Sequence, residues 1–355
     1  MAAVGDADIA YWLKELHELI SPNFTRAEPR QRAWNYMCGL AEQTAPGGRR
    51  NIASYANERR ADGAQRLLTM AQWDENEVRR NLLEVVKRYF GLANGGLYMT
   101  EGTFAKKGSD AVAVDRQFSV DNRRLENCQI ALLMFYSTPG GALVLIDAEP
   151  YLPSSWLGDA NRRRKASIPS DLGYRTKSQI VIGMIKRAMD AGLEPRMSSF
   201  SLLCSDKITL RRTLQERGIP YLIPLTLGEF ESLSGMETKD PRLDVMTLTG
   251  RTPRSYYHGR PQLVEQYAAH SPSGRCSSHS AYYCAGTRRL ISNGELSQLI
   301  IELKRMEARW RAIRLEIRLD RYEVRSWRGW HRHMTLAMAV QTAMELARQV
   351  PGRCG

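Results

Sequence analysis

The sequence predicts an α/β fold in which helices flank a mixed sheet, with a helical region before the sheet and an insertion before the last helices. Apolar residues recur at helical spacing near both ends of the chain. From Gly95 onward the pattern changes to short apolar runs separated by turn signals, which is typical of strands. Strand-like runs then alternate with helical segments, an order that favours the α/β class.

The helices of the first region are predicted from apolar stripes. Trp12, Leu13 and Leu16 lie on one face near its start, and Val78 and Leu82 lie on one face near its end. The sequence also predicts shorter helices over residues 30–40 and 64–70.

Short apolar runs predict the strands, and longer periodic runs predict the later helices. The predicted strands are Leu97–Met99, Ala111–Val114, Gln129–Tyr136, Ala142–Ile146, Ser198–Leu203 and Tyr221–Ile223. The predicted helices are Lys177–Ala191, Thr209–Arg217, Glu295–Leu319 and Gly329–Gln349.

A chain of 355 residues is long enough for more than one packed unit. We expect a helical domain over residues 1–92, the first part of the sheet core over 93–224, and the C-terminal helices over 285–355. Between them, over 225–284, periodicity fades while Gly, Ser, Thr and Pro become frequent. This stretch is either an inserted subdomain or a long irregular excursion, and the sequence does not decide which.

Composition and charge limit the kinds of partner and the location that we expect for this protein. The formal net charge of +13 favours a polyanion as the partner, and nucleic acid before other polyanions, although solubility alone can also explain a basic chain.

No run approaches the roughly 18 to 20 apolar residues of a membrane span, and the charged residues of Met1–Ile20 are unlike a signal peptide. The six cysteines show no paired short spacing, so we expect reduced thiols and a cytoplasmic protein. Cys276, His279 and Cys284 lack the spacing of a zinc finger, so no metal site is predicted there.

Several motifs resemble, in order, those of a bacterial insertion-sequence transposase family of the DDE class. The resemblance runs from about residue 24 to 345 and is weakest between 225 and 290. It implies a ribonuclease-H-like mixed sheet flanked by helices. The matching segments are Arg26–Arg32, Asp62–Leu68, Phe104–Gly108, Glu126–Gln129, Tyr151–Pro153 with Trp156, Tyr322–Trp330 and His331–Met338.

In such transposases two aspartates and a glutamate hold two divalent metals for phosphodiester cleavage. The resemblance puts Thr100 at the first aspartate and Ser201 at the second. It puts Glu307 at the third acid, with Arg314 where the family usually has a lysine. A hydroxyl can ligate Mg²⁺ but does not supply the charge of a carboxylate. We therefore expect the two-metal site, and with it the family's cofactor, to be lost.

Two further residues are candidates for a changed chemistry in this cleft. Glu101 neighbours Thr100 in the sequence, but adjacent side chains of a strand point to opposite faces, so it cannot simply replace the lost aspartate. Cys204 follows Ser201 by three residues.

The basic residues form two candidate nucleic-acid contacts. Lys304, Arg311 and Arg318 recur every seven residues on the predicted helix over 295–319, and Arg314 widens the same polar face. A track of phosphate contacts and a solvated helix face explain this pattern about equally well. The densest basic run, Arg162, Arg163, Arg164 and Lys165, carries the same two interpretations.

Two hypotheses follow, and a third ranks last. The first is a domesticated transposase that binds DNA without cleaving it. The second is the same fold used by an enzyme that acts on a small molecule in the vacated cleft, since fold does not fix function. The third is an active transposase with displaced acids. A homodimer is expected only by analogy with transposases that act on paired DNA ends.

Overall fold

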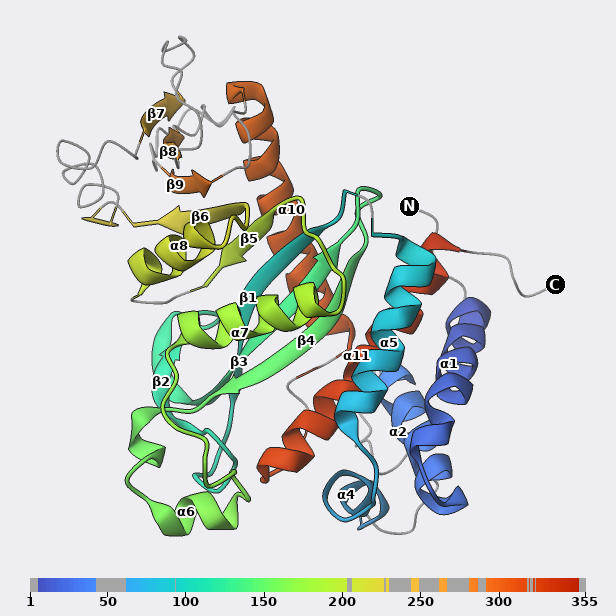
Figure 1. Ribbon diagram of the computed structural model, residues 1–355. Coiled ribbons are helices and arrows are strands. Elements are labelled where there is room, and N and C mark those ends of the chain that lie inside the picture. Colours follow the sequence, from blue (N-terminus) through green and yellow to red (C-terminus); the bar gives the residue numbers. More distant parts are fainter. Residues whose placement is uncertain are drawn as a thin grey trace, which may run out of the picture.

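The computed structural model describes a mixed α/β protein in which a curled sheet carries helices on both faces (Figure 1). This confirms the predicted fold class. The described residues are 6–42, 62–92, 94–202, 206–226, 228–229, 244–248, 262–266, 281–286, 292–317, 319, 322 and 324–350.

The first described helices are α1, α2, α4 and α5, and they precede the sheet. Their bounds are α1 Asp6–Ile20, α2 Ala27–Glu42, α4 Asp62–Thr69 and α5 Glu75–Phe90. After them come β1 Gly96–Ala105, β2 Asp115–Ser119, β3 Arg124–Ser137, β4 Leu143–Tyr151, α6 Ala160–Lys165, α7 Lys177–Asp190, β5 Ser198–Ser201, α8 Lys207–Glu216 and β6 Tyr221–Leu225. The chain ends with β7 Asp244–Leu248, β8 Gln262–Gln266, β9 Ala281–Gly286, α10 Asn293–Glu316 and α11 Trp327–Gln349.

The described strands form one mixed sheet in the order β2-β3-β1-β5-β6-β9-β8-β7. Strand β4 also pairs with β3, next to the part of β3 that pairs with β2. Strands β2, β3 and β4 form antiparallel pairs, and β3 also pairs antiparallel with β1. Strands β1, β5 and β6 run parallel. The parallel register places Thr100 of β1 beside Ser201 of β5, so the two positions singled out by the sequence are neighbours in the sheet.

Each face of the sheet has its own apolar core. Leu97 and Met99 of β1 belong to the core beneath α7 and α8. Tyr98 and Phe104 of the same strand belong to the core on the other face, beneath α10, α11 and the first helices. The alternation follows from the period of two in a strand. It decides which face receives each candidate site residue.

Helix α11 is buried along almost its whole length between the sheet and the first helices (Figure 1). Most of its buried residues are apolar or small, as expected of a helix enclosed by protein, but Arg332, His333 and Glu345 are buried with them. Polar contacts anchor it: the Trp330 indole donates to the Tyr322 hydroxyl (3.0 Å), which donates to Gln129 on β3 (2.8 Å). The C-terminal motifs therefore have a structural role in the core.

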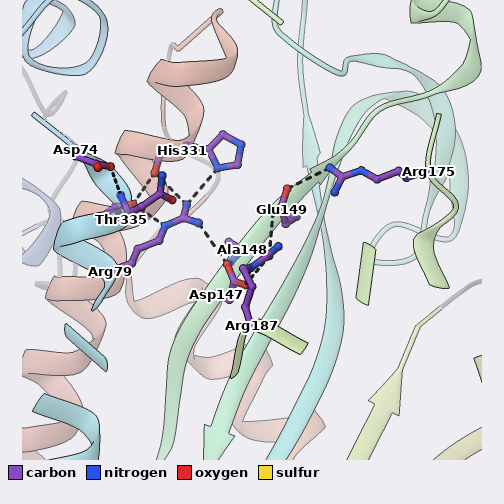
Figure 2. A network of polar contacts seen from close by, with 10 residues as sticks. Asp74, Arg79, Asp147, Ala148, Glu149, Arg175, Arg187, His331 and Thr335 are labelled. Carbon is purple, nitrogen blue, oxygen red and sulfur yellow. Dashed lines mark hydrogen bonds and ion pairs between the residues drawn. The ribbon is translucent and has the colours of Figure 1, made fainter. Parts of the chain in front are cut away.

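A buried ion network joins α5, β4, α7 and α11 (Figure 2). Asp147 of β4 accepts from Arg79 of α5 (3.3 Å) and from Arg187 of α7 (2.7 Å). Arg79 also donates to Thr335 (2.9 Å) and to His331 Nδ1 (3.2 Å), both on α11. The network thus fixes α5, α7 and α11 against β4 of the sheet.

The predicted strand over Ala111–Val114 is wrong. These residues form a turn, with Ala113 at φ 60°, and β2 begins at Asp115. Their apolar character has another cause: Val112 and Val114 are buried, and the Val112 N–H donates to the Arg325 carbonyl (2.9 Å) instead of to a strand. A short apolar run therefore marked burial and not a strand.

The stretch over 225–284, whose structure the sequence leaves open, contributes β7, β8 and most of β9 to the same sheet. Strand β9 pairs antiparallel with β6, and β8 pairs with β9. No helix in the described part of the chain combines the length and apolarity that a bilayer span requires.

Candidate functional site

Thr100 lies in the middle of β1, beside Ser201, which is the last residue of the parallel strand β5. The Thr100 hydroxyl donates a hydrogen bond to the Ser201 carbonyl oxygen (3.3 Å). Thr100 is 3% exposed, so its hydroxyl takes its partner from the protein. The two positions that the family resemblance assigns to aspartates are thus adjacent, and both carry hydroxyls.

Helix α10 brings the third position to the same place. The helix starts with a capping box, in which Ser292 accepts from the Glu295 N–H and Glu295 accepts from the Ser292 N–H. Its approach to β1 is close, because a Cβ on Gly102 would lie 3.3 Å from the Trp310 ring. Four helical turns from its start, Glu307 accepts a hydrogen bond from the Ser201 hydroxyl at 2.9 Å. Thr100, Ser201 and Glu307 therefore form one cluster.

Two buried tyrosines complete the cluster. Burial raises the pKa of Tyr98 to about 12, and the charge of Glu307 adds to this rise. Burial and the same carboxylate raise the pKa of Tyr283 to about 12. Tyr98 could have been predicted, since it precedes Thr100 by two residues in one strand and shares its face. Tyr283 lies on β9, in a stretch with no sequence signal that would place it here.

Glu101 lies on the opposite face of the sheet from this cluster. It is 3% exposed and forms an ion pair with Lys177 at the start of α7 (2.5 Å). The strand alternation argued from the sequence therefore agrees with its position. Cys204, the other candidate for a changed chemistry, lies outside the described residues.

Two of the four basic residues of α6 bind within the protein, and the other two are exposed. Arg162 donates to the carbonyls of Ser109 (3.0 Å) and Val114 (2.9 Å), and Arg163 donates to those of Pro169 and Leu172. These two guanidinium groups hold loops together. Arg164 and Lys165 are exposed.

The basic residues of α10 also differ in their exposure and contacts. Lys304 and Arg311 are exposed, and Arg311 is close enough to Tyr98 to influence its pKa electrostatically. Arg314 is bound within the protein: it pairs with Asp121 of the turn between β2 and β3, and it donates to the Thr103 carbonyl (2.5 Å). Arg318 lies outside the described residues.

Within the described part of the chain, no group of three or more His, Cys, Asp and Glu side chains is arranged to hold a metal ion. Cys276 and His279, weighed above as zinc ligands, lie outside that part. Cys284 is a buried, reduced cysteine on β9.

Comparison with known proteins identifies the family. None of the curated proteins compared with this chain matches it. The family described as DDE superfamily endonuclease matches residues 20–231, which is more than half of the chain and includes both Thr100 and Ser201. With the mixed sheet and flanking helices described above, this match means that the chain belongs to the DDE superfamily of endonucleases.

Proposed function

We propose that this DDE-superfamily protein binds DNA without hydrolysing it. The observation that carries the proposal is the cluster at β1, β5 and α10. The fold still brings three side chains together, but Thr100 and Ser201 supply hydroxyls and Glu307 accepts the Ser201 hydroxyl at 2.9 Å.

The donor set does not fit the two divalent ions that the family implies. Three carboxylates would offer three negative charges, whereas these residues offer the single charge of Glu307. Mg²⁺ binds through carboxylates and demands near-ideal octahedral geometry, so two neutral hydroxyls that are already hydrogen-bonded within the protein are a poor replacement. We therefore expect no hydrolysis of DNA by this chain.

Three features support retained DNA binding. The chain belongs to a superfamily of endonucleases, and its net charge is +13. Lys304 and Arg311 are exposed on the helix that carries Glu307, and Arg164 and Lys165 are exposed on α6. Arginine and lysine contacts to phosphates release counterions, so the affinity should fall steeply with salt.

A fluorescence anisotropy titration of the full chain against random-sequence duplex DNA tests the binding. We expect the association constant to fall by at least about tenfold between roughly 50 and 200 mM NaCl, since even a few phosphate contacts give a slope of that size. The variant Lys304→Ala/Arg311→Ala should flatten this salt dependence, while the control Arg88→Ala/Arg212→Ala, which removes two other exposed arginines, should not. No binding at the lower salt would overturn the proposal.

A second candidate is an enzyme that acts on a small molecule at the same cluster. The observation that favours it is the set of polar groups around Glu307, namely the hydroxyls of Ser201, Tyr98 and Tyr283. Absence of DNA binding in the same titration would favour this candidate. Screening for compounds that raise the unfolding temperature of the natural chain, but not of Glu307→Gln, would then test it.

A further inference from the structure

The hairpin formed by β2 and β3 exposes an apolar pair that the site described above does not use. Phe118 and Leu125 face each other across the two strands, and they are 43% and 59% exposed. Val120, in the turn, is 40% exposed. Large apolar side chains that are exposed side by side are candidates for a contact site.

Two arginines accompany the apolar pair. Arg116 lies two residues before Phe118 and therefore shares its face, and Arg123 lies in the turn. Both are exposed.

The acidic residues of the hairpin are engaged elsewhere. Asp115 accepts from Ser155, Asp121 pairs with Arg314, and Glu126 pairs with Arg124 (3.0 Å). Among the described residues, neither Arg116 nor Arg123 forms an ion pair with a carboxylate. The hairpin thus offers two cations beside an exposed apolar pair.

The same turn is fixed to the elements of the functional cluster. Asp121 accepts from the Thr103 N–H of β1 (2.9 Å) and pairs with Arg314 of α10. Arg314 follows Glu307 by seven residues, or two helical turns, and Arg311 lies between them on the same side of the helix. The exposed cation Arg311 therefore lies between Glu307 and the hairpin.

We infer that the β2–β3 hairpin is a DNA contact that recognises exposed bases. Arg116 and Arg123 bind phosphates, while Phe118 and Leu125 pack against bases that are unstacked from the helix. Aromatic side chains stack on unpaired bases of any sequence, and apolar side chains are used elsewhere to wedge open base steps. The inference rests on the proposed function, because it names the DNA structure that the same protein prefers.

Charge favours DNA over a second copy of the chain as the occupant. Each copy carries a net charge of +13, and pairing two hairpins would bring unpaired arginines together. DNA supplies both of the required chemistries, which are negative charge and planar apolar rings.

The test compares two labelled DNAs with the full chain by fluorescence anisotropy: a perfect duplex, and the same duplex with a central run of three mismatches. We expect the natural chain to bind the mismatched DNA about tenfold more tightly, within the range of one stacked base. Phe118→Ser/Leu125→Ser should lose this preference and keep its affinity for the perfect duplex. The control Leu19→Ser/Leu92→Ser removes two exposed leucines of the helical region and should keep the preference.

Each outcome decides between the claims. If the natural chain binds neither DNA, the proposed function fails. If it binds both, and Phe118→Ser/Leu125→Ser keeps the natural preference, the hairpin inference alone is overturned. It is also overturned if that variant abolishes self-association in sedimentation while DNA binding stays unchanged, because a second copy is then the partner. Arg116→Ala/Arg123→Ala, which leaves the apolar pair intact, should weaken binding to both DNAs and keeps the test informative if the serine variant does not fold.

Discussion

At the scale of single residues, the candidate cluster joins side chains from β1, β5 and α10. Motif spacing and strand alternation predict its first members. Thr100 and Ser201 lie in strands flanked by recognisable motifs, and the structure brings them together with Glu307. Tyr283 could not be predicted in the same way, since its approach depends on the pairing of β9 with β6, whose partner residues are 57 to 65 positions apart in the chain. Long-range pairing leaves no local periodicity to read.

The buried His333 should make the stability of the protein depend on pH. Burial lowers the pKa of His333 to about 3, from an ordinary value of 6.5, while its Nδ1 hydrogen-bonds the Tyr36 hydroxyl at 2.7 Å. Between those two pH values the unfolded chain binds a proton that the folded chain does not, so the free energy of unfolding falls as the pH falls. From pH 7.5 to 5.0 the loss from this residue should be about 2 kcal/mol, at about 1.4 kcal/mol per pH unit below 6.5.

Urea unfolding at pH 7.5 and 5.0 measures this loss. His333→Asn, whose amide can take the place of Nδ1, should show a smaller drop than the natural chain. Burial also lowers the pKa of His331, so part of the drop should persist in the variant. An equal drop in both proteins would mean that His333 is protonated in the folded chain.

At the scale of elements, α10 shows where a sequence pattern and its structural use diverge. Arg309 is a further basic residue of this helix, and it pairs with Glu316 (2.7 Å) and with the buried Glu345 of α11. Arg348 of α11 pairs with the same two acids, at 2.8 and 2.9 Å. Although burial opposes ionisation, these arginines lower the pKa of Glu316. The basic residues of α10 therefore include a link between helices as well as exposed cations, and the sequence alone does not distinguish the two.

Glu345→Gln should lower the free energy of unfolding by about 2 kcal/mol, because it removes the buried charge between two arginines. Glu302→Gln on α10 is a matched control, since Glu302 is 40% exposed and pairs with Arg196 at 3.7 Å. That exposed pair should contribute less than about 1 kcal/mol. Chemical denaturation of the two variants measures the difference, and equal losses would contradict a clamp at Glu345.

At the scale of the whole molecule, the fold class was predictable because the spacing of apolar residues changes from the helical to the strand period where the sheet begins. The extension of the sheet by β7, β8 and β9 was not, since residues 225–284 lack a clear period. The attachment of α5 to the sheet was also not predictable, because Asp147, Arg79 and His331 come from distant parts of the chain (Figure 2). Charged residues so far apart give no sign in the sequence that they will meet.

A DNA-cleavage assay tests whether the substituted cluster can hydrolyse DNA. Supercoiled plasmid is incubated with the natural chain and Mg²⁺ at a protein concentration that saturates binding, beside Thr100→Asp/Ser201→Asp and the charge-matched control Ser154→Asp/Ser170→Asp. We expect the natural chain to bind the plasmid and leave it supercoiled, because Glu307 alone cannot hold two metal ions. Magnesium-dependent nicking by the natural chain, abolished in Glu307→Gln, would contradict this expectation.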